Sequence, residues 1–421
     1  MSSFSNRIDI ISVFFYIALI TIGVLAIYSS SYSPALEGEF ALSGIAKKQL
    51  IWIGVCFLLI ILIVYTNVSA FNFGAYAMYG SVLLLLVIVL LFGTTVAGSK
   101  SWFDFFGVRF QPSELAKYTT ALVLAKFLSR ENNMLRNYVN VLKASAIIMV
   151  PLIFILMQND TGSALVFFSF VLVFYREGLP GFWLLIAVWF VALFVLTFLA
   201  GSMYLSVVIA LLGILIIVLV NDKKKLMLPI IGATVISIVF IFTVKLAFEN
   251  VLQEHQRNRI LVTFGMIEDN KDLGYNVYHS QIAIGAGQIS GRGFLKGTQT
   301  KLGFVPEQST DFIFCTIAEE TGFLGSVGFL LLYFGFLARL VFLAERQHSI
   351  FSRVFGYGVI SILFFHAVIN IGMTMKIIPV IGIPLPFISY GGSSLLGFTL
   401  LVFTFLRLDA NRALEINRAR E

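Results

Sequence analysis

Charged residues are scarce in this chain: they make up 12% of the 421 positions, whereas hydrophobic residues make up 59%. A soluble globular protein typically carries about 25% charged residues. With so few charges, the chain cannot cover its apolar side chains with a surface compatible with water, and its mean hydropathy is +0.94. Soluble folds, disordered chains and collagen-like repeats are therefore excluded. The composition indicates a protein whose solvent is lipid.

Cysteine and histidine are also few. The two cysteines, Cys56 and Cys315, lie in apolar runs and supply no disulfide framework. The four histidines show no zinc-ligand spacing, so we expect no dedicated metal site. A net charge of +7 could suggest a nucleic-acid partner. In a membrane protein, the lysine and arginine bias of cytoplasmic loops explains it better, and we expect no nucleic acid.

Apolar runs long enough to span a bilayer recur along the whole chain. A spanning helix needs about 20 apolar residues. The runs that qualify, or nearly do, are 8–30, 49–66, 73–93, 112–129, 142–158, 160–176, 180–200, 203–220, 226–248, 311–343, 354–376 and 385–408. They predict an all-α polytopic membrane protein of about 10–12 transmembrane helices, folded as a single integral membrane domain. The weakest runs, 112–129 and 160–176, are each compatible with a tilted or half-membrane helix.

The distribution of cations predicts the orientation. If the N-terminus is cytoplasmic, most loop cations fall on the cytoplasmic side, as the positive-inside rule requires. They include Arg130, Arg136, Arg176, Lys223, Lys224, Lys225, Arg346 and Arg353. The extracytoplasmic side then receives a loop at 94–111 and a long one at about 249–310. Connections between bundle helices usually have 2–8 residues, so we expect the long loop to be functional.

Several basic residues nevertheless fall on the predicted extracytoplasmic side. They are Lys100, Arg109, Arg257, Arg259, Arg292, Lys296 and Lys301. Long loops escape the positive-inside rule, which is one explanation. The other is recognition of an anionic, phosphorylated ligand, because arginine binds phosphate oxygens bidentately. The glycines between 285 and 297 match neither nucleotide-binding pattern, so no nucleotide site is expected.

Asp311 stands where the long loop meets an apolar helix. A carboxylate at the edge of the membrane is partly desolvated, which raises its pKa toward the range of a general base. Aspartate is also a favoured helix N-cap. Both roles are open from the residues alone. On a helical wheel Glu319 could share a cavity with Asp311, whereas Glu320 could not.

Other polar residues lie within the apolar runs. Glu114 and Lys117 are spaced i,i+3 on one helix and can pair, either as mutual neutralisation or in the lining of a polar cavity. Asp160 is placed to cap a helix. Trp102 is either an interfacial anchor or a stacking platform for a sugar ring.

Residues 382–394, G-I-P-L-P-F-I-S-Y-G-G-S-S, break a helix at membrane depth. Irregular backbone there is tolerated only when it is buried in protein or lines a cavity. The segment, which contains Ser389, therefore indicates a polar cavity.

Together these stretches resemble the SEDS family, the RodA/FtsW/SpoVE-type membrane proteins of bacterial cell-wall synthesis. The matching residues are 102–117 (W…QPSE..K), 158–162, 306–314 (PE..TDFIF) with 318–320, and 382–394. Residues 297–299 look more like the RodA branch than the FtsW branch. The family usually has ten spans, so the resemblance implies an extra transmembrane hairpin within about 180–248. The chain reads Q-N-D-T-G at 158–162, where the family commonly has Q-P-D-L-G.

The resemblance implies a peptidoglycan glycosyltransferase of the bacterial inner membrane, with its active site on the extracytoplasmic side. Its substrate would be lipid II, a disaccharide-pentapeptide on undecaprenyl diphosphate, polymerised during cell elongation. Asp311 matches the family's essential aspartate and would be the general base for an inverting attack by the acceptor hydroxyl. The residues implied to bind substrate are Trp102, Glu114, Lys117, Arg257, Arg259 and Glu307. Those implied to build the cavity are Asp160, Glu319 and Ser389.

The resemblance also implies partners. The chain has no S-x-x-K nucleophile in an outer domain, so a class B penicillin-binding protein would crosslink the strands, alongside other elongation proteins. A divalent cation, Mg or Mn, could accompany the substrate diphosphate. Three alternatives stay open: a lipid II flippase, a division or sporulation paralogue, and a non-enzymatic scaffold.

Overall fold

The structure is a computed structural model. It describes residues 8–32, 43–96, 98–105, 108–130, 135, 137–220, 223–250, 252, 254–266, 273–301, 304–305 and 307–418. Within these residues, ten helices are long and apolar enough to cross a membrane, which confirms the predicted polytopic helical membrane protein. The chain divides into two compact units, residues 1–178 with 275–421, and residues 179–274. Each is described by itself.

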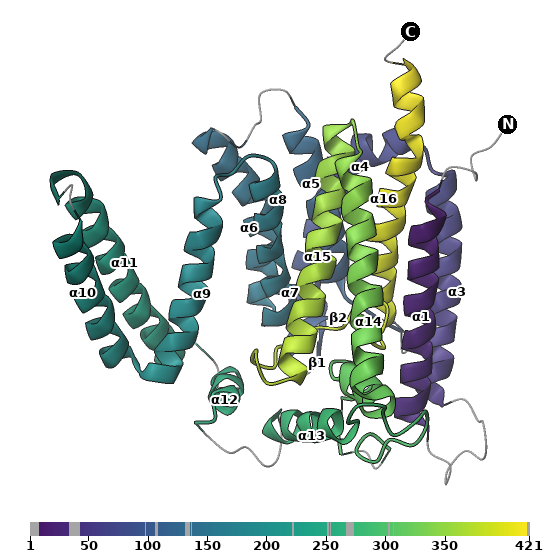
Figure 1. Cartoon of the computed structure of the whole chain (residues 1–421). Coiled ribbons are helices and arrows are strands. Elements are labelled where there is room, and N and C mark those ends of the chain that lie inside the picture. The colour runs from purple at the N-terminus through teal and green to yellow at the C-terminus, as the bar shows by residue number, and fades with distance from the viewer. Residues whose placement is uncertain are drawn as a thin grey trace. The chain divides into compact units, whose positions relative to one another are not determined.

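The larger unit is a helical bundle (Figure 1). Its helices are α1 (Ile10–Ser31), α3 (Gly44–Tyr65), α4 (Val68–Phe92), α5 (Pro112–Leu128), α6 (Tyr138–Met157), α7 (Thr161–Val166), the 3-10 helix η2 (Phe167–Phe170), α8 (Val171–Arg176), α13 (Leu273–Ala286), α14 (Ile313–Glu345), α15 (Ile350–Thr374) and α16 (Gly392–Arg418). α14 packs on α1 and α15, and α16 packs on α3. α5 packs on α4, α6, α15 and α16, and nearly all of its residues are buried. A helix enclosed by protein can carry polar side chains, which explains why the run at 112–129 is weakly apolar.

The run at 160–176 forms one short apolar helical stretch, Thr161–Arg176, made up of α7, η2 and α8, as the half-membrane alternative allowed. Two expectations need correction. The described residues between 94 and 110 are not a plain loop but form an antiparallel sheet of β1 (Thr94–Val96), β2 (Ser99–Phe105) and β3 (Val108–Phe110), in the order β1-β2-β3. The last helix begins at Gly392 rather than at 385, because the prolines at 384 and 386 cannot donate backbone hydrogen bonds to a helix.

The smaller unit holds α9 (Phe182–Ala200), α10 (Ser202–Leu219), α11 (Lys223–Asn250) and α12 (Glu254–Thr263). α10 and α11 pack closely at Gly213, where an added Cβ would lie 2.4 Å from Thr234 Oγ1. Leu193, Leu205 and Ile241 belong to its small apolar core. Both helix pairs that the sequence offers as an extra hairpin, α9–α10 and α10–α11, are therefore present as helices. Which pair is additional stays a prediction.

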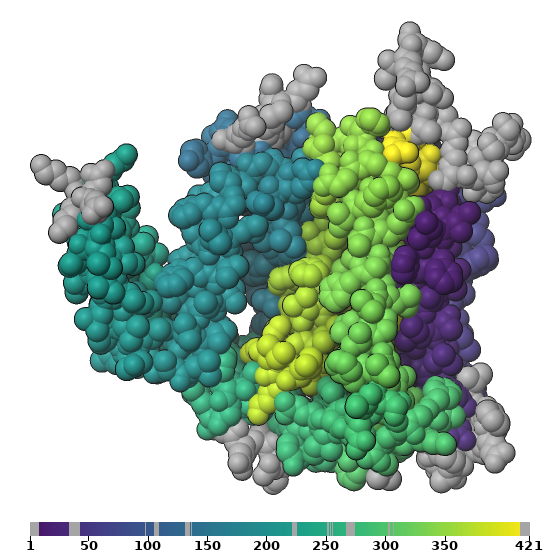
Figure 2. Space-filling model, viewed as in Figure 1, coloured from purple at the N-terminus to yellow at the C-terminus, as the bar shows by residue number. Residues whose placement is uncertain are grey.

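The long loop packs around the first turns of α14, which is broken at Gly322 (φ 67°, ψ −163°). The glycine-rich segment after α13 lies against residues 313–321. An added Cβ on Gly287 would lie 2.1 Å from the Ala318 carbonyl oxygen, and one on Gly291 would lie 2.1 Å from that of Glu320. The glycines therefore permit close backbone packing. Figure 2 shows this part of the chain gathered at the end of the bundle where α14 begins.

Gly322→Ala is expected to destabilise the protein by about 3 kcal/mol or more, since its φ and ψ are accessible essentially to glycine alone. Its Cβ would also lie 2.2 Å from the Gly291 backbone nitrogen. The matched control is Gly328→Ala on the same helix, where an added Cβ meets nothing within 4 Å. Thermal unfolding in detergent micelles measures both variants. An unchanged melting temperature for Gly322→Ala would contradict the packing described.

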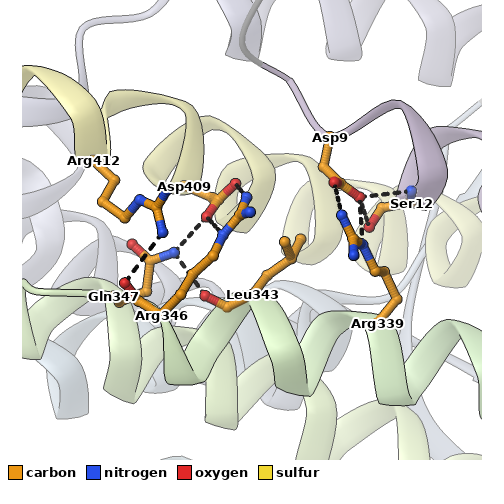
Figure 3. A network of polar contacts seen from close by, with 8 residues as sticks. All are labelled: Asp9, Ser12, Arg339, Leu343, Arg346, Gln347, Asp409 and Arg412. Carbon is orange, nitrogen blue, oxygen red and sulfur yellow. Dashed lines mark hydrogen bonds and ion pairs between the residues drawn. The ribbon is translucent and has the colours of Figure 1, made fainter.

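Ion pairs connect helices at the other end of the bundle, where α14 ends, and Figure 3 shows them from close by. Asp9 caps α1 through the Ser12 N–H and also accepts hydrogen bonds from Arg339 of α14. Burial alone would raise the pKa of Asp9, but the hydrogen bonds from Arg339 and Ser12 outweigh it and lower the pKa to about 2. Asp409 of α16 accepts from Arg346 and from Gln347. These contacts join α1, α14 and α16.

α15 is held at both of its ends. Near its start, Arg353 forms an ion pair with Glu177, which follows α8, at 2.9 Å. At its end, the Thr374 carbonyl oxygen accepts from Ser280 Oγ at 3.1 Å, and that of Met375 accepts from Gln281 Nε2 at 3.4 Å. Ser280 and Gln281 lie on α13. Residues on both sides of the 179–274 unit therefore anchor on this one helix.

Candidate functional site

Two irregular segments meet where α14 begins. The first, residues 307–312, precedes α14, and the second, residues 376–391, joins α15 to α16. Tyr390 N donates to the Ser309 carbonyl oxygen at 2.8 Å. Ser389 Oγ donates to the Thr310 carbonyl oxygen at 2.5 Å and accepts from Leu385 N at 2.8 Å. Ser389, predicted to build the cavity, thus joins the two segments.

Asp311 lies within the first of these segments. α14 begins at Ile313 with Phe312 as its N-cap, so Asp311 does not occupy the capping position, and the N-cap alternative is wrong. Its side chain is half-buried. An added Cβ on Gly382 would lie 3.2 Å from Asp311 Oδ2, which places the carboxylate beside the second segment. Gly382 has φ 78°, a backbone conformation that favours glycine.

α15 supplies two polar side chains beneath these segments. Asn370 Nδ2 donates to the carbonyl oxygens of Asp311, at 2.8 Å, and Ile383, at 2.7 Å. One turn earlier, His366 Nδ1 lies 3.1 Å from the Pro384 carbonyl oxygen. From the sequence, the four histidines, His366 among them, are considered only as zinc ligands, and Asn370 is not singled out. The available signal was a pair of polar residues, spaced i,i+4, in an apolar helix.

The predicted pairing of Glu114 with Lys117 is confirmed. Lys117 Nζ lies 2.8 Å from Glu114 Oε1, and the two residues are 1% and 3% exposed. The ammonium also lies 2.9 Å from His366 Nε2. Glu114 Oε2 is buried without a hydrogen-bond partner in the described part of the chain. Lys117 therefore engages α15 rather than an open surface where a diphosphate would bind.

Asp160 caps α7, as predicted. Its Oδ1 accepts from Ser163 N at 3.0 Å, and its Oδ2 accepts from Gln111 Nε2 at 2.7 Å. An added Cβ on Gly162 would lie 3.0 Å from the Ile381 carbonyl oxygen. The stretch 158–162 therefore contacts both the start of α5 and the segment 376–391, although these stretches lie far apart in the sequence.

Glu319 does not lie in a cavity shared with Asp311, contrary to expectation. The helical wheel assumed that both residues lie on one helix, but α14 begins after Asp311. The Glu319 carboxylate is fully buried and accepts from the backbone N–H groups of Thr298, Gln299 and Thr300 at 2.6–3.0 Å. The hydroxyls of both threonines donate to it as well. Glu319 therefore anchors the long loop.

Glu320 and Lys301 extend this anchorage to α1. Glu320 Oε1 accepts from Leu295 N at 3.0 Å and from Ser29 Oγ. Lys301 Nζ donates to the Ser29 carbonyl oxygen near the end of α1. Burial lowers the pKa of Lys301, against the opposing influence of Glu320 and Glu319. Lys301 is one of the basic residues on the predicted extracytoplasmic side, and this contact gives it a structural role.

The remaining candidates are more dispersed. Trp102 lies half-buried in β2, paired with Thr94 of β1. Glu307 is exposed, and its Oε2 accepts from Thr310 Oγ1 at 2.8 Å. Arg257 and Arg259 lie on α12 in the 179–274 unit. Their substrate contacts stay predictions.

The motif residue Pro306 lies outside the described residues. Among the residues that are described, no group of three or more His, Cys, Asp or Glu side chains could hold a metal ion.

The fold and this site define a multi-pass membrane protein with a half-buried carboxylate held between two irregular segments at one end of its bundle. The chain belongs to the FtsW/RodA/SpoVE family of cell cycle proteins, whose model matches residues 10–206 and 177–413. The family resemblance in the sequence is thereby confirmed.

Individual relatives agree with this assignment. The peptidoglycan glycosyltransferase MrdB of Escherichia coli (strain K12) is 30% identical over 382 residues, covering 90% of this chain and 87% of that protein. The peptidoglycan glycosyltransferase RodA of Treponema pallidum (strain Nichols) is 32% identical over 427 residues, covering 94% and 95%. A chain of a solved peptidoglycan synthase complex, described as coordinating polymerization and crosslinking, matches with a TM-score of 0.71 and 26% identity, covering 97% and 99%.

Proposed function

We propose that this chain is a peptidoglycan glycosyltransferase of the RodA type, which polymerises lipid II into glycan strands during cell elongation. The names of its relatives support the activity and the elongation role. The observation that carries the chemistry is the position of Asp311. Its half-buried carboxylate lies beside Gly382, in backbone that is irregular on both sides. Such backbone at membrane depth is tolerated where it is buried in protein or lines a cavity, and a cavity beside Asp311 is what the proposed reaction requires.

Asp311 acts as the general base. It takes the proton of the acceptor sugar hydroxyl while the hydroxyl oxygen attacks C1 of the donor sugar. The new glycosidic bond forms as the bond from C1 to the diphosphate oxygen breaks, and undecaprenyl diphosphate leaves. Displacing an α-linked diphosphate to form a β-linkage inverts the configuration at C1. Inversion requires one base and no covalent enzyme intermediate, by the logic of inverting glycosidases.

The end of the bundle that carries Asp311 faces the extracytoplasmic side of the bacterial inner membrane. Cations at the opposite end support this orientation, because cytoplasmic loops are enriched in lysine and arginine. They are Arg176, Arg346, Arg353 and Arg412. Lipid II would enter laterally from the bilayer with its diphosphate at this outer end.

The other site residues have subsidiary roles. Arg257 and Arg259 bind the diphosphate. A divalent cation, Mg or Mn, would supply further neutralisation of charge on the leaving diphosphate. Trp102 stacks on a sugar, and Glu307 contacts the substrate near Asp311. The partner that crosslinks the strands is a class B penicillin-binding protein. The solved complex that couples polymerization to crosslinking supports such a partner.

Purified protein with its penicillin-binding partner and labelled lipid II is expected to form glycan polymer, because the base and its surroundings are supplied by this chain. Gel separation of the labelled product measures chain length. A partner whose transpeptidase serine is replaced is the control, because it removes crosslinking and should leave polymerisation intact. If no polymer forms while labelled lipid II exchanges between vesicle leaflets, the protein is a flippase instead, a function for which broken helices are also characteristic.

A further inference from the structure

Asn370 and His366 are buried polar residues for which the proposed reaction has no direct use. They are 0% and 1% exposed and lie one turn apart on α15. Burying a polar side chain costs free energy unless its hydrogen bonds are satisfied. The atoms that satisfy them therefore indicate what these residues do.

Asn370 connects the two irregular segments through a single amide group. A side-chain amide nitrogen carries two hydrogens. One is donated to the carbonyl oxygen of Asp311 and the other to that of Ile383. The first bond holds the backbone of the proposed base directly. The second holds the residue that follows Gly382, whose Cα lies beside the Asp311 carboxylate.

His366 is fixed in a single tautomer, and in this tautomer it hydrogen-bonds the carbonyl oxygen of the next residue of the segment, Pro384. An ammonium group can only donate, so Nε2 must accept from Lys117 Nζ. Nδ1 then carries the proton and donates to the Pro384 carbonyl oxygen. Lys117 is itself fixed by Glu114. A chain of four groups thus runs from the buried ion pair of α5, through α15, to the segment beside Asp311.

We propose that His366 and Asn370 are positioning residues that hold the Asp311 carboxylate in its reactive geometry, with the Glu114–Lys117 pair fixing the tautomer of His366. This inference rests on the proposed function, since it assigns the support of the same base. Neither residue touches the reacting atoms. Their effect is on alignment, and a misplacement of about 1 Å can reduce the rate about 100-fold.

Asn370→Leu tests the proposal most directly, because it keeps the approximate size and branching of the side chain and removes both donors. We expect kcat for lipid II polymerisation to fall by about 10- to 100-fold with KM changed less than about twofold, as for an interaction that matters only in the transition state. A purely structural role would instead lower the amount of folded protein, so rates are measured on the monodisperse fraction and normalised to it.

A pair of substitutions at His366 separates its two contacts. The amide nitrogen of asparagine can take the place of Nδ1 as a donor, whereas the amide of glutamine reaches the place of Nε2, where its oxygen can accept from Lys117 Nζ. His366→Asn is therefore expected to keep the bond to Pro384 and most of kcat, whereas His366→Gln loses that bond and about 10-fold or more in kcat. Equal kcat values for the two variants would overturn the assignment of His366.

The matched control is Tyr333→Phe. The Tyr333 hydroxyl, on α14, donates to the Leu363 carbonyl oxygen at 3.0 Å in a buried position. Leu363 lies on α15, as do His366 and Asn370. Loss of the hydroxyl removes one buried hydrogen bond of α15 away from residues 376–391 and should leave kcat unchanged. An equal fall in this variant, or wild-type kcat in Asn370→Leu, would overturn the proposal. If the wild type forms no polymer, or Asp311→Asn remains active, the proposed function itself is wrong.

Discussion

Asp311→Asn is expected to abolish glycan polymerisation while the protein stays folded. The amide keeps the size of the side chain but cannot accept a proton from the acceptor hydroxyl. General-base catalysis typically contributes about 10²- to 10⁴-fold to a rate, so the residual activity should be below about 1%. Because Phe312 rather than Asp311 is the N-cap of α14, folding should be little affected. Polymerisation of labelled lipid II measures the loss.

Asp104→Asn is the matched control for this experiment. Asp104 is a carboxylate of β2, partly exposed and 3.5 Å from Arg109, and it has no part in the proposed chemistry. Its replacement should leave polymerisation at the wild-type rate, because surface ion pairs contribute little. Polymer formation at a wild-type rate by folded Asp311→Asn would remove Asp311 from the reaction.

Lys117→Met is expected to lower the free energy of unfolding by about 3–5 kcal/mol, because it leaves the Glu114 carboxylate buried without its partner. The Glu114 side chain is 4% exposed, and its Oε2 is buried without a hydrogen-bond partner among the described residues. Denaturant unfolding in detergent micelles measures the change.

The double variant Glu114→Gln with Lys117→Met supplies the comparison. Removing both charges should restore most of the stability, because a neutral side chain costs far less to bury than an unpaired charge. The bond to His366 Nε2 is not restored, so polymerisation should stay low even in the stable double variant. A double variant no more stable than Lys117→Met would show that the buried charge is not the cause.

Features that depend on nearby residues could be predicted from the sequence. Ten apolar runs appear as helices of membrane length because each run alone satisfies the length requirement. The Glu114–Lys117 pair and the Asp160 cap are contacts between residues three positions apart. The small sheet was missed, since two of its strands have only three residues and carry too little alternation to recognise.

Features that depend on distant residues could not be predicted. The support of Asp311 by Asn370, and the enclosure of Glu319 by residues 298–300, arise only when separate segments are folded together. The helical wheel placed Glu319 wrongly because nothing local in the sequence indicates that α14 begins at Ile313. Arg257 and Arg259 stay predictions for a related reason, since they belong to the 179–274 unit and Asp311 belongs to the other.

The anchoring of α15 at both ends has a mechanical consequence. Glu177 forms an ion pair with Arg353 near its start, and Ser280 and Gln281 donate hydrogen bonds to backbone carbonyls at its end. These residues are the places where the chain departs into the 179–274 unit and comes back. His366 and Asn370 lie between these two sets of contacts. The two places where the chain leaves and re-enters the larger unit are therefore fixed to the same helix whose Asn370 donates to the Asp311 carbonyl oxygen.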